Sequence, residues 1–497
     1  MTGRVKHRRT LANAGWIFLH RSVSGCSVLV AHALFARILL PAEVGLYHLA
    51  VFMGVVGATL ATGGLPSAAT RFIALEAGRG GGVAPAIARR VLLASAAGAI
   101  LVAAAGAAAL SLGPPSWRPA SLGAMVGFFA AHSLRLSAAG LAGGYAEFRV
   151  QAGASLAASL IMPVGAVWLW LHHGNISGAL WITAAHAAAT GGLVLWRLRG
   201  RFRGGPALPS AVGRRFWRYC GGVTTILLLD AVVWQQSEAV FLRLLSVPAQ
   251  LGLYTVAFSL VTQAMQLLPG SLGAAVFPAL AYQTGEGRDR ELAALVSRST
   301  RLIAMGALPI AAFGMAFAGE IMVVLYGPGF GGGASALRIL WPGAASGALA
   351  VAAAAALYAS GRERVLIAIG LPVAALNIAL DLVLIAPFGA MGAAAANSVA
   401  ELVGASAAVL AANRVLGGST FPSRSLIRIV PATAVAAVAA HWASSGADGV
   451  GCLLRGALVF AAVVLAGFFA LGETSVEEIK GLLRGLGPAG SAAGTGR

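Results

Sequence analysis

The chain has 497 residues, of which 58% are apolar and only 10% are charged. Soluble domains carry about 25% charged residues, so this composition excludes a set of water-soluble domains. Its apolar runs are long enough to cross a bilayer, and we expect a polytopic membrane protein. The 35 Lys and Arg residues exceed the 16 Asp and Glu by a net charge of +19, which their positions must explain.

Apolar segments, separated by short polar or Gly/Pro-rich breaks, predict an all-α membrane protein. The first segment follows a basic start and continues through Leu40, beyond the apolar core of a signal peptide, so we interpret it as an uncleaved span. In chain order the fourteen predicted spans are 16–40, 44–64, 91–112, 121–143, 150–172, 176–196, 219–245, 249–277, 299–325, 334–359, 363–386, 389–412, 425–442 and 450–471.

The basic residues predict the topology. When the loops alternate between the two sides with the amino terminus inside, most Lys and Arg residues fall in inside loops, including the polar segment from about Arg197 to Arg218. Lys and Arg near span ends are retained on the cytoplasmic side. The charge excess therefore indicates topology, not nucleic-acid binding. We expect both termini to be cytoplasmic.

A repeated element divides the chain into two halves. FARILLPAEVGLY over 35–47 matches FLRLLSVPAQLGLY over 241–254 with a one-residue gap, and each copy joins the first two spans of its half. Six spans separate the copies, so both loops face outside and the halves are parallel repeats about an axis along the membrane normal. The predicted domains are an N-terminal six-helix lobe over 1–196, a basic cytoplasmic linker over 197–218, a C-terminal six-helix lobe over 219–412, and two additional helices with a tail over 413–497.

Several motifs resemble those of a known family: the repeated element, GLPSAATRF over 64–72, LYGPGF over 325–330 and NIALDLVLIAPFGAMGAA over 377–394. From Trp16 to about Leu416 the chain resembles the polysaccharide-biosynthesis flippases of the multidrug/oligosaccharidyl-lipid/polysaccharide exporter superfamily. The resemblance implies about 14 transmembrane helices in a V-shaped bundle with a central cavity. It also implies a bacterial inner-membrane protein that moves undecaprenyl-pyrophosphate-linked oligosaccharide from the cytoplasmic to the outer leaflet, for O-antigen, capsule or exopolysaccharide.

Ionisable side chains inside a membrane are costly, so they are the first candidates for a site. Arg135 lies about 12 Å from the end of its span, too deep to snorkel easily, and His132 shares its helix face. Arg21 lies nearer the cytoplasmic surface, where snorkelling competes with a site role. No acid lies within the spans of this half. We therefore expect the first lobe to hold the pyrophosphate of the substrate.

The second half carries the membrane acids. Asp230 lies near the middle of its span, and a polar run follows it. These side chains predict a glycan path, with interhelical hydrogen bonding as the alternative. The residues expected to line this path are Asp230, Trp234, Gln235 and Glu238.

Two polar pairs with i,i+4 spacing lie on helices joined by a short turn, Asn377 with Asp381 and Asn397 with Glu401. Asp381 and Asn397 lie at similar depth, so a hydrogen bond between them is expected. The pairs indicate either a structural clasp or a site for a coupling H⁺ or Na⁺. Apart from this ion we expect no cofactor or metal, and the three cysteines form no metal-binding pair.

The alternatives are a lipid II flippase or an ion-coupled multidrug antiporter of the same superfamily. An exporter of cationic drugs should present carboxylates in both lobes, and the first lobe offers none. A membrane-embedded glycosyltransferase or polymerase is more remote, because every outside loop is short. We therefore predict a monomeric transporter, not an enzyme. Its expected partners are the lipid-linked oligosaccharide, membrane lipid, and the polymerase and glycosyltransferases of the same pathway.

Overall fold

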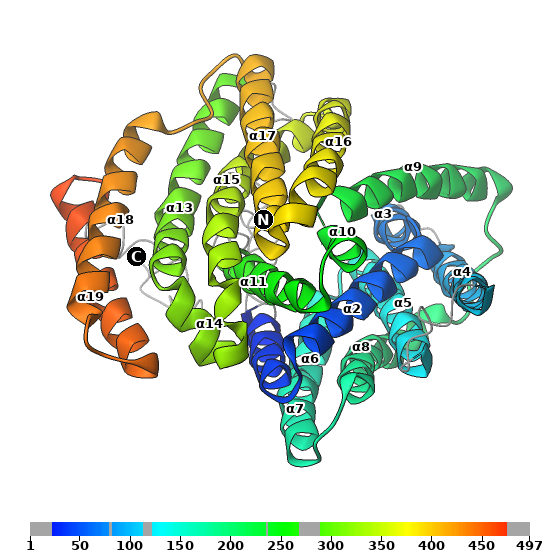
Figure 1. Cartoon of the computed structure of the whole chain (residues 1–497). Coiled ribbons are helices and arrows are strands. Elements are labelled where there is room, and N and C mark those ends of the chain that lie inside the picture. Colours follow the sequence, from blue (N-terminus) through cyan, green and yellow to red (C-terminus); the bar gives the residue numbers. More distant parts are fainter. Residues whose placement is uncertain (1–21, 79–81, 113–121, 235–236, 268–288, 475–497) are drawn as a thin grey trace, which may run out of the picture.

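A computed structural model of the chain describes residues 22–78, 82–112, 122–234, 237–267 and 289–474, which form helices and no strand (Figure 1). The first helix is Ser22–Ile38. The first half continues with α2 (Pro41–Thr62), α3 (Leu65–Gly78), α4 (Ala84–Leu112), α5 (Leu122–Gly144), α6 (Phe148–Ser159), α7 (Ile161–Leu171), α8 (Ile176–Leu198) and the short η2 (Arg199–Phe202).

The second half has the same all-helical character. Its elements are α9 (Ser210–Trp234), α10 (Glu238–Leu245), α11 (Pro248–Leu267), α13 (Asp289–Ala316), α14 (Ala318–Tyr326), η3 (Pro328–Gly333), α15 (Ala334–Ala359), α16 (Glu363–Phe388) and α17 (Ala390–Leu416), followed by α18 (Ser423–Ser444) and α19 (Gly449–Ala470).

The predicted all-α membrane class is confirmed. Among the described residues, eleven helical segments are long and apolar enough to cross a membrane, one of them made of α6 and α7 together. The other three predicted spans, 16–40, 219–245 and 249–277, extend into residues outside the described ranges. The total of fourteen therefore stays a prediction. Many large apolar side chains are exposed on these helices, as expected of a surface that faces lipid.

The segment before the third predicted span is helical where the sequence predicted a loop. α3 carries Arg71 and Glu76 in a stretch too polar to be read as a span, and α4 begins at Ala84, ahead of the predicted start at residue 91. A span predicted from hydropathy ends where charged residues begin. Arginine is nevertheless a good helix former, so the helix itself continues through such residues. Arg89 and Arg90 consequently lie within α4.

The predicted span over 150–172 consists of two helices, α6 and α7. Pro163 has no N–H to donate to the carbonyl oxygen of Ser159, and α6 ends at that residue. The Ser27 hydroxyl donates a hydrogen bond to this carbonyl, and the hydroxyls of Ser24 and Ser155 lie 3.0 Å apart. The first helix therefore packs against α6 where proline interrupts the backbone ladder.

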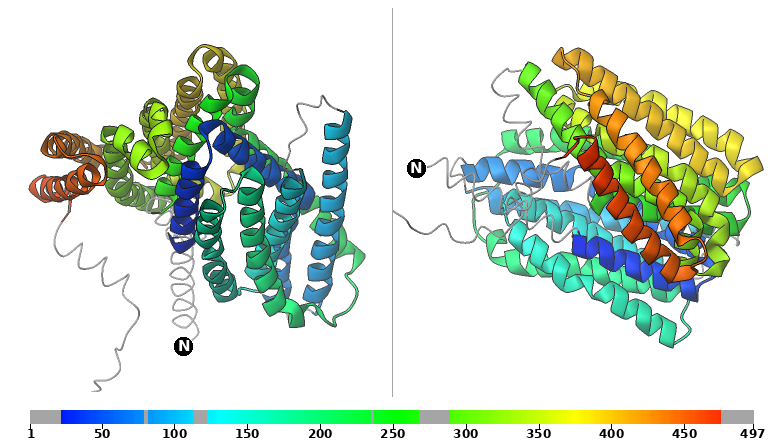
Figure 2. Two further views of the ribbon diagram at one scale, coloured as in Figure 1. Left: turned by 60° about the horizontal axis from the view of Figure 1, so that its bottom comes forward. Right: turned by 90° about the vertical axis from the view of Figure 1, so that its left-hand side faces the viewer.

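The helices form two groups that meet along α2 and α11. The blue and cyan helices of the first half occupy the lower right of Figure 1, and α15, α16 and α17 occupy its upper middle. α2 packs against α11, and α3 packs against α9. α18 and α19 lie at the far edge of the second group and face the viewer in the right-hand view of Figure 2. The predicted domain boundaries stay a prediction, although part of the linker over 197–218 is helical, in η2 and the start of α9.

Glu473, which follows α19, ties the last two helices to the bundle. Its side chain is only 2% exposed, accepts a hydrogen bond of 2.6 Å from Arg301 Nε on α13, and lies 3.8 Å from Arg428 on α18. We expect Glu473→Ala to lower the free energy of unfolding by about 2 kcal/mol, because hydrogen bonds to charged groups contribute on this order. Thermal unfolding in detergent measures the loss.

The matched control for this variant is Glu147→Ala. Glu147 pairs with Arg201 at 3.0 Å, but both side chains are substantially exposed. Such surface pairs contribute less than about 1 kcal/mol. Equal destabilisation by the two substitutions would contradict a specific role for Glu473.

Candidate functional site

A cavity of about 690 Å³ lies between the two groups of helices. This volume falls within the range of small-molecule binding sites. One side of its wall comes from the first helix, α2, α3 and α5, and the other side comes from α9 and α11. The lining residues are His32, Val55, Thr59, Thr62, Gly63, Pro66, Ser67, His132, Arg135, Leu136, Leu227, Ser259, Thr262, Gln263 and Gln266.

Arg135 brings a positive charge to this wall from α5, with His132 beside it. Arg135 Nη2 lies 3.2 Å from His132 Nε2, one helical turn away. α5 packs closely on α8 at Gly191, where an added Cβ would lie 3.0 Å from the Arg135 backbone. Arginine carries its charge at any physiological pH. Within the described part of the chain no carboxylate lines the cavity, so Arg135 gives the cavity wall a positive charge.

The opposite wall is a polar face of α11 that the sequence analysis did not identify. Ser259, Thr262, Gln263 and Gln266 all line the cavity. Their spacing of three, four and seven residues places them on one side of a helix. This spacing of polar residues inside an apolar span was the signal in the sequence from which the polar face could have been predicted. The arrangement sets hydroxyl and amide groups opposite a guanidinium, which suits a ligand with an anionic part and a polyhydroxyl part.

The two copies of the repeated element pack backbone to backbone, in what we call the repeat contact (Pro41, Gly45, Gly252 and Arg37). A Cβ on Gly45 would lie 2.6 Å from Gly252 N, and a Cβ on Gly252 would overlap the carbonyl oxygen of Pro41. Arg37 Nε donates a hydrogen bond of 3.2 Å to the Leu325 carbonyl, and its guanidinium also donates to the Val324 carbonyl. The beginnings of α2 and α11 are therefore in close backbone contact, and Arg37 joins the first helix to the end of α14.

A second junction, the α3–α9 contact (Gly64, Arg71, Tyr219, Cys220 and Thr224), joins the two groups beyond the far end of α2. Gly64 N donates a hydrogen bond of 2.9 Å to Thr224 Oγ1, and a Cβ on Gly64 would overlap the carbonyl oxygen of Cys220. The Arg71 guanidinium lies 4.7 Å from the centre of the Tyr219 ring. The cavity therefore lies between two junctions, each of which requires a glycine for close approach.

A separate polar cluster lies in the second group, formed by the buried Glu238, Asn377, Asp381 and Asn397 and the partly buried Glu401. The Asn377 and Asn397 amides donate to the same oxygen, Glu238 Oε1, at 2.9 and 3.2 Å. Glu238 was predicted in the glycan path, but its carboxylate joins this cluster. The hydrogen bond predicted between Asp381 and Asn397 is absent, because Asn397 donates to Glu238 instead. Glu401 packs against α15, where a Cβ on Gly347 would lie 2.7 Å from its carboxylate.

Several oxygens of this cluster are buried without a partner. Within the described residues, both Asp381 carboxylate oxygens and Asn377 Oδ1 accept no hydrogen bond. Asp381 is 0% exposed. Buried carboxylate and amide oxygens without donors suit a proton or a hard cation. The described part of the chain holds no group of three or more His, Cys, Asp or Glu side chains arranged for a metal ion.

The remaining predicted site residues are only partly visible. Arg21 and Gln235 lie outside the described residues, and for Asp230 and Trp234 only the backbone, in α9, is described. The predicted pyrophosphate pair of His132 and Arg135 lies in the cavity wall. Whether these residues bind substrate stays a prediction.

Two family models match the chain. The model described as a polysaccharide biosynthesis protein matches residues 34–331, and the model described as lipid II flippase MurJ matches residues 247–457. No curated protein matches the sequence.

Solved structures share the fold over most of the chain. Lipid II flippase MurJ, in an inward closed conformation, has a TM-score of 0.70 at 13% identity and covers 91% of this chain and 96% of its own. An inward-facing multidrug resistance MATE transporter of the MOP superfamily has a TM-score of 0.63 at 14% identity, with 80% and 98% covered. A MOP superfamily transporter from Pyrococcus furiosus has a TM-score of 0.61 at 16% identity, with 82% and 95% covered. At these identities the likeness shows the fold.

Proposed function

Because the chain belongs to the polysaccharide biosynthesis protein family, whose model matches residues 34–331, we propose that it moves undecaprenyl-pyrophosphate-linked oligosaccharide repeat units from the cytoplasmic to the outer leaflet of a bacterial inner membrane. The chain is a multi-pass membrane protein with the fold of MOP superfamily transporters. In this proposal it acts as a monomer with cytoplasmic termini and catalyses no reaction. Glycosyltransferases make its substrate, and a polymerase joins the products into O-antigen, capsule or exopolysaccharide.

The observation that carries the proposal is the chemistry of the cavity. Arg135, with His132 beside it, faces a wall of hydroxyl and amide side chains on α11, and no described carboxylate lines the space. Arginine pairs with phosphate through two parallel N–H donors, which adds geometric specificity. Neutral polar groups on the opposite wall can exchange hydrogen bonds with sugar hydroxyls. A cationic drug would meet an unfavourable charge here, so the multidrug antiporter is disfavoured.

Alternating access follows from the two junctions that flank the cavity. Opening the α3–α9 contact would admit the substrate headgroup from the side of the basic linker, and opening the repeat contact would release it on the other side. The lipid tail would stay in the bilayer throughout. Opening and closing these interfaces in turn requires no chemical step.

A lipid II flippase is the second candidate. The observation in its favour is the match of the MurJ model to residues 247–457. Both substrates join a polyprenyl chain to a glycan through pyrophosphate, so the wall around Arg135 suits either. Purified protein in liposomes, given fluorescently labelled versions of the two lipids in parallel, distinguishes them. Faster translocation of the oligosaccharide lipid supports the proposal, and faster or exclusive translocation of lipid II overturns it.

We also propose that the cluster around Asp381 binds the coupling ion, H⁺ or Na⁺. Its buried oxygens without donors support this role more than that of a clasp, which would satisfy its own groups. α10, α16 and α17 supply the cluster, and α10 follows α9 directly in the chain. In this proposal, ion binding at Glu238 and Asp381 shifts the α3–α9 contact between its open and closed states, and the effect is transmitted through α9.

The Asp381→Asn substitution tests the coupling role. It keeps the shape of the side chain but removes its negative charge. We expect substrate transport in liposomes to lose its response to a Na⁺ or H⁺ gradient, with the gradient-driven rate falling about tenfold or more, in the usual range of coupling energies. Asp448→Asn, at an exposed acid before α19, should leave the response intact. A normal response in Asp381→Asn would refute the coupling site.

A further inference from the structure

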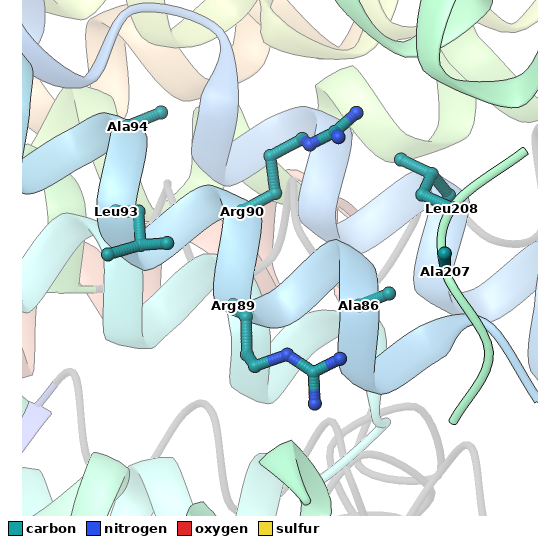
Figure 3. A pocket seen from close by; sticks show the side chains of 7 residues that line it. All are labelled: Ala86, Arg89, Arg90, Leu93, Ala94, Ala207 and Leu208. Carbon is teal, nitrogen blue, oxygen red and sulfur yellow. The ribbon is translucent and has the colours of Figure 1, made fainter. Parts of the chain in front are cut away.

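A second hollow, of about 550 Å³, lies on α4 and the linker, away from the central cavity (Figure 3). α4 supplies five of its lining residues, Ala86, Arg89, Arg90, Leu93 and Ala94, and the linker supplies two further apolar side chains. The two hollows share no lining residue. The linker residues are Ala207 and Leu208.

The two arginines of this hollow have different surroundings. In Figure 3 their side chains extend in different directions from α4. Arg89 Nη1 donates hydrogen bonds of 3.0 Å to the carbonyls of Phe202 and Gly204, which holds the linker against the helix. Arg90 is exposed and has no hydrogen-bond or ion-pair partner among the described residues. Arg90 is therefore a fixed positive charge available to a ligand.

An exposed apolar face of α4 continues from this charge into the membrane. Leu93, Ala96, Ala97, Ile100 and Leu101 are all exposed, and their spacing places them on one face of the helix. Leu93 and Ile100 are 73% and 69% exposed. The face begins one turn after Arg89 and Arg90, so the charge and the apolar face lie in line along a membrane span.

We propose that this hollow binds the phosphate of an anionic phospholipid, with Arg90 holding the headgroup and one acyl chain lying along Leu93, Ala97 and Ile100. A membrane phospholipid fits because its phosphate group matches the charge of Arg90 and its acyl chain matches the exposed apolar face of α4. A soluble phosphate would use only the arginine, and a neutral lipid would use only the apolar face. Because Arg89 fastens the linker beside this hollow, the bound lipid also packs against Leu208 and steadies the connection between the two halves.

The test is native mass spectrometry of the full-length protein in detergent, titrated with phosphatidylglycerol. Arg90→Ala should weaken the first binding event about tenfold, the effect of losing one charged hydrogen bond. Arg90→Lys should keep most of the affinity. The matched control is Arg149→Ala, which removes an exposed arginine of α6 outside the hollow and should bind as the unaltered protein does. Thermal unfolding without lipid confirms that the variants fold alike.

Three outcomes would overturn the proposal. The first is unchanged affinity in Arg90→Ala. The second is an equal loss in Arg149→Ala, which would indicate a diffuse charge effect. The third is binding of inorganic phosphate as tightly as the lipid, which would show that the acyl chain contributes nothing. Phosphatidylethanolamine provides the zwitterionic comparison. It should bind the unaltered protein more weakly than phosphatidylglycerol does, whereas the two lipids should bind Arg90→Ala equally.

Discussion

Replacing Arg135 by alanine should abolish complementation of a flippase-null strain while the protein accumulates to normal abundance. The guanidinium supplies the fixed charge in a cavity wall without a described carboxylate. Removing one partner of a desolvated charge pair costs about 3 kcal/mol, roughly a hundredfold in affinity. Complementation, with the membrane abundance of each variant measured by immunoblotting, provides the readout.

Two variants make this result specific. Arg135→Lys keeps the charge but loses the two-pronged geometry, so it should retain part of the activity. Arg149→Ala removes an exposed arginine of α6 that does not line the cavity, and it should complement fully. Unaltered complementation by Arg135→Ala would remove the anion site from this account.

Adding a branched side chain at either glycine junction should hold the transporter open on one side. In Gly252→Val the new side chain meets the Pro41 backbone, and in Gly64→Val it meets the Cys220 backbone. Overpacking of this kind costs about 2 kcal/mol, which shifts a two-state equilibrium roughly thirtyfold. Both variants should lose transport, but with the cavity exposed to opposite sides of the membrane.

A cysteine introduced at Ser67 in the cavity wall reports this exposure, after the three native cysteines are replaced. A membrane-impermeant maleimide should label it faster from the side of Pro41 in Gly252→Val and faster from the side of the basic linker in Gly64→Val. Gly221 has open space for a Cβ, so Gly221→Ala on the same helix as Cys220 serves as the control and should label as the parent does. The same labelling pattern in both glycine variants would contradict alternating access through these junctions.

Much of the fold could be predicted because it depends on local composition. Apolar runs located the helices, and the repeat around Pro41 and Pro248 pointed to two related halves. The α6–α7 break and the early start of α4 were missed for local reasons, a proline and two arginines that hydropathy alone misjudges. The packing of Gly252 on Pro41 could not be predicted, because the repeat gives similarity between two segments and not their contact.

The candidate site was predictable only where a charge stood out. Arg135 and His132 were found because ionisable groups deep in a span are costly. The α11 face from Ser259 to Gln266 was missed, since neutral polar residues occur in many spans as interhelical hydrogen-bonding groups. Glu238 was assigned to the glycan path because its neighbours in sequence are polar. Its actual partners, Asn377 and Asn397, are 139 and 159 residues away, beyond the reach of any spacing argument.

The most direct measurement is an experimental structure of the protein with an undecaprenyl-pyrophosphate disaccharide bound in a lipid nanodisc. The account predicts pyrophosphate oxygens within hydrogen-bonding distance of the Arg135 guanidinium, with the sugars against Gln263 and Gln266 of α11. A headgroup bound outside the cavity, or inside it without contact to Arg135, would contradict the account.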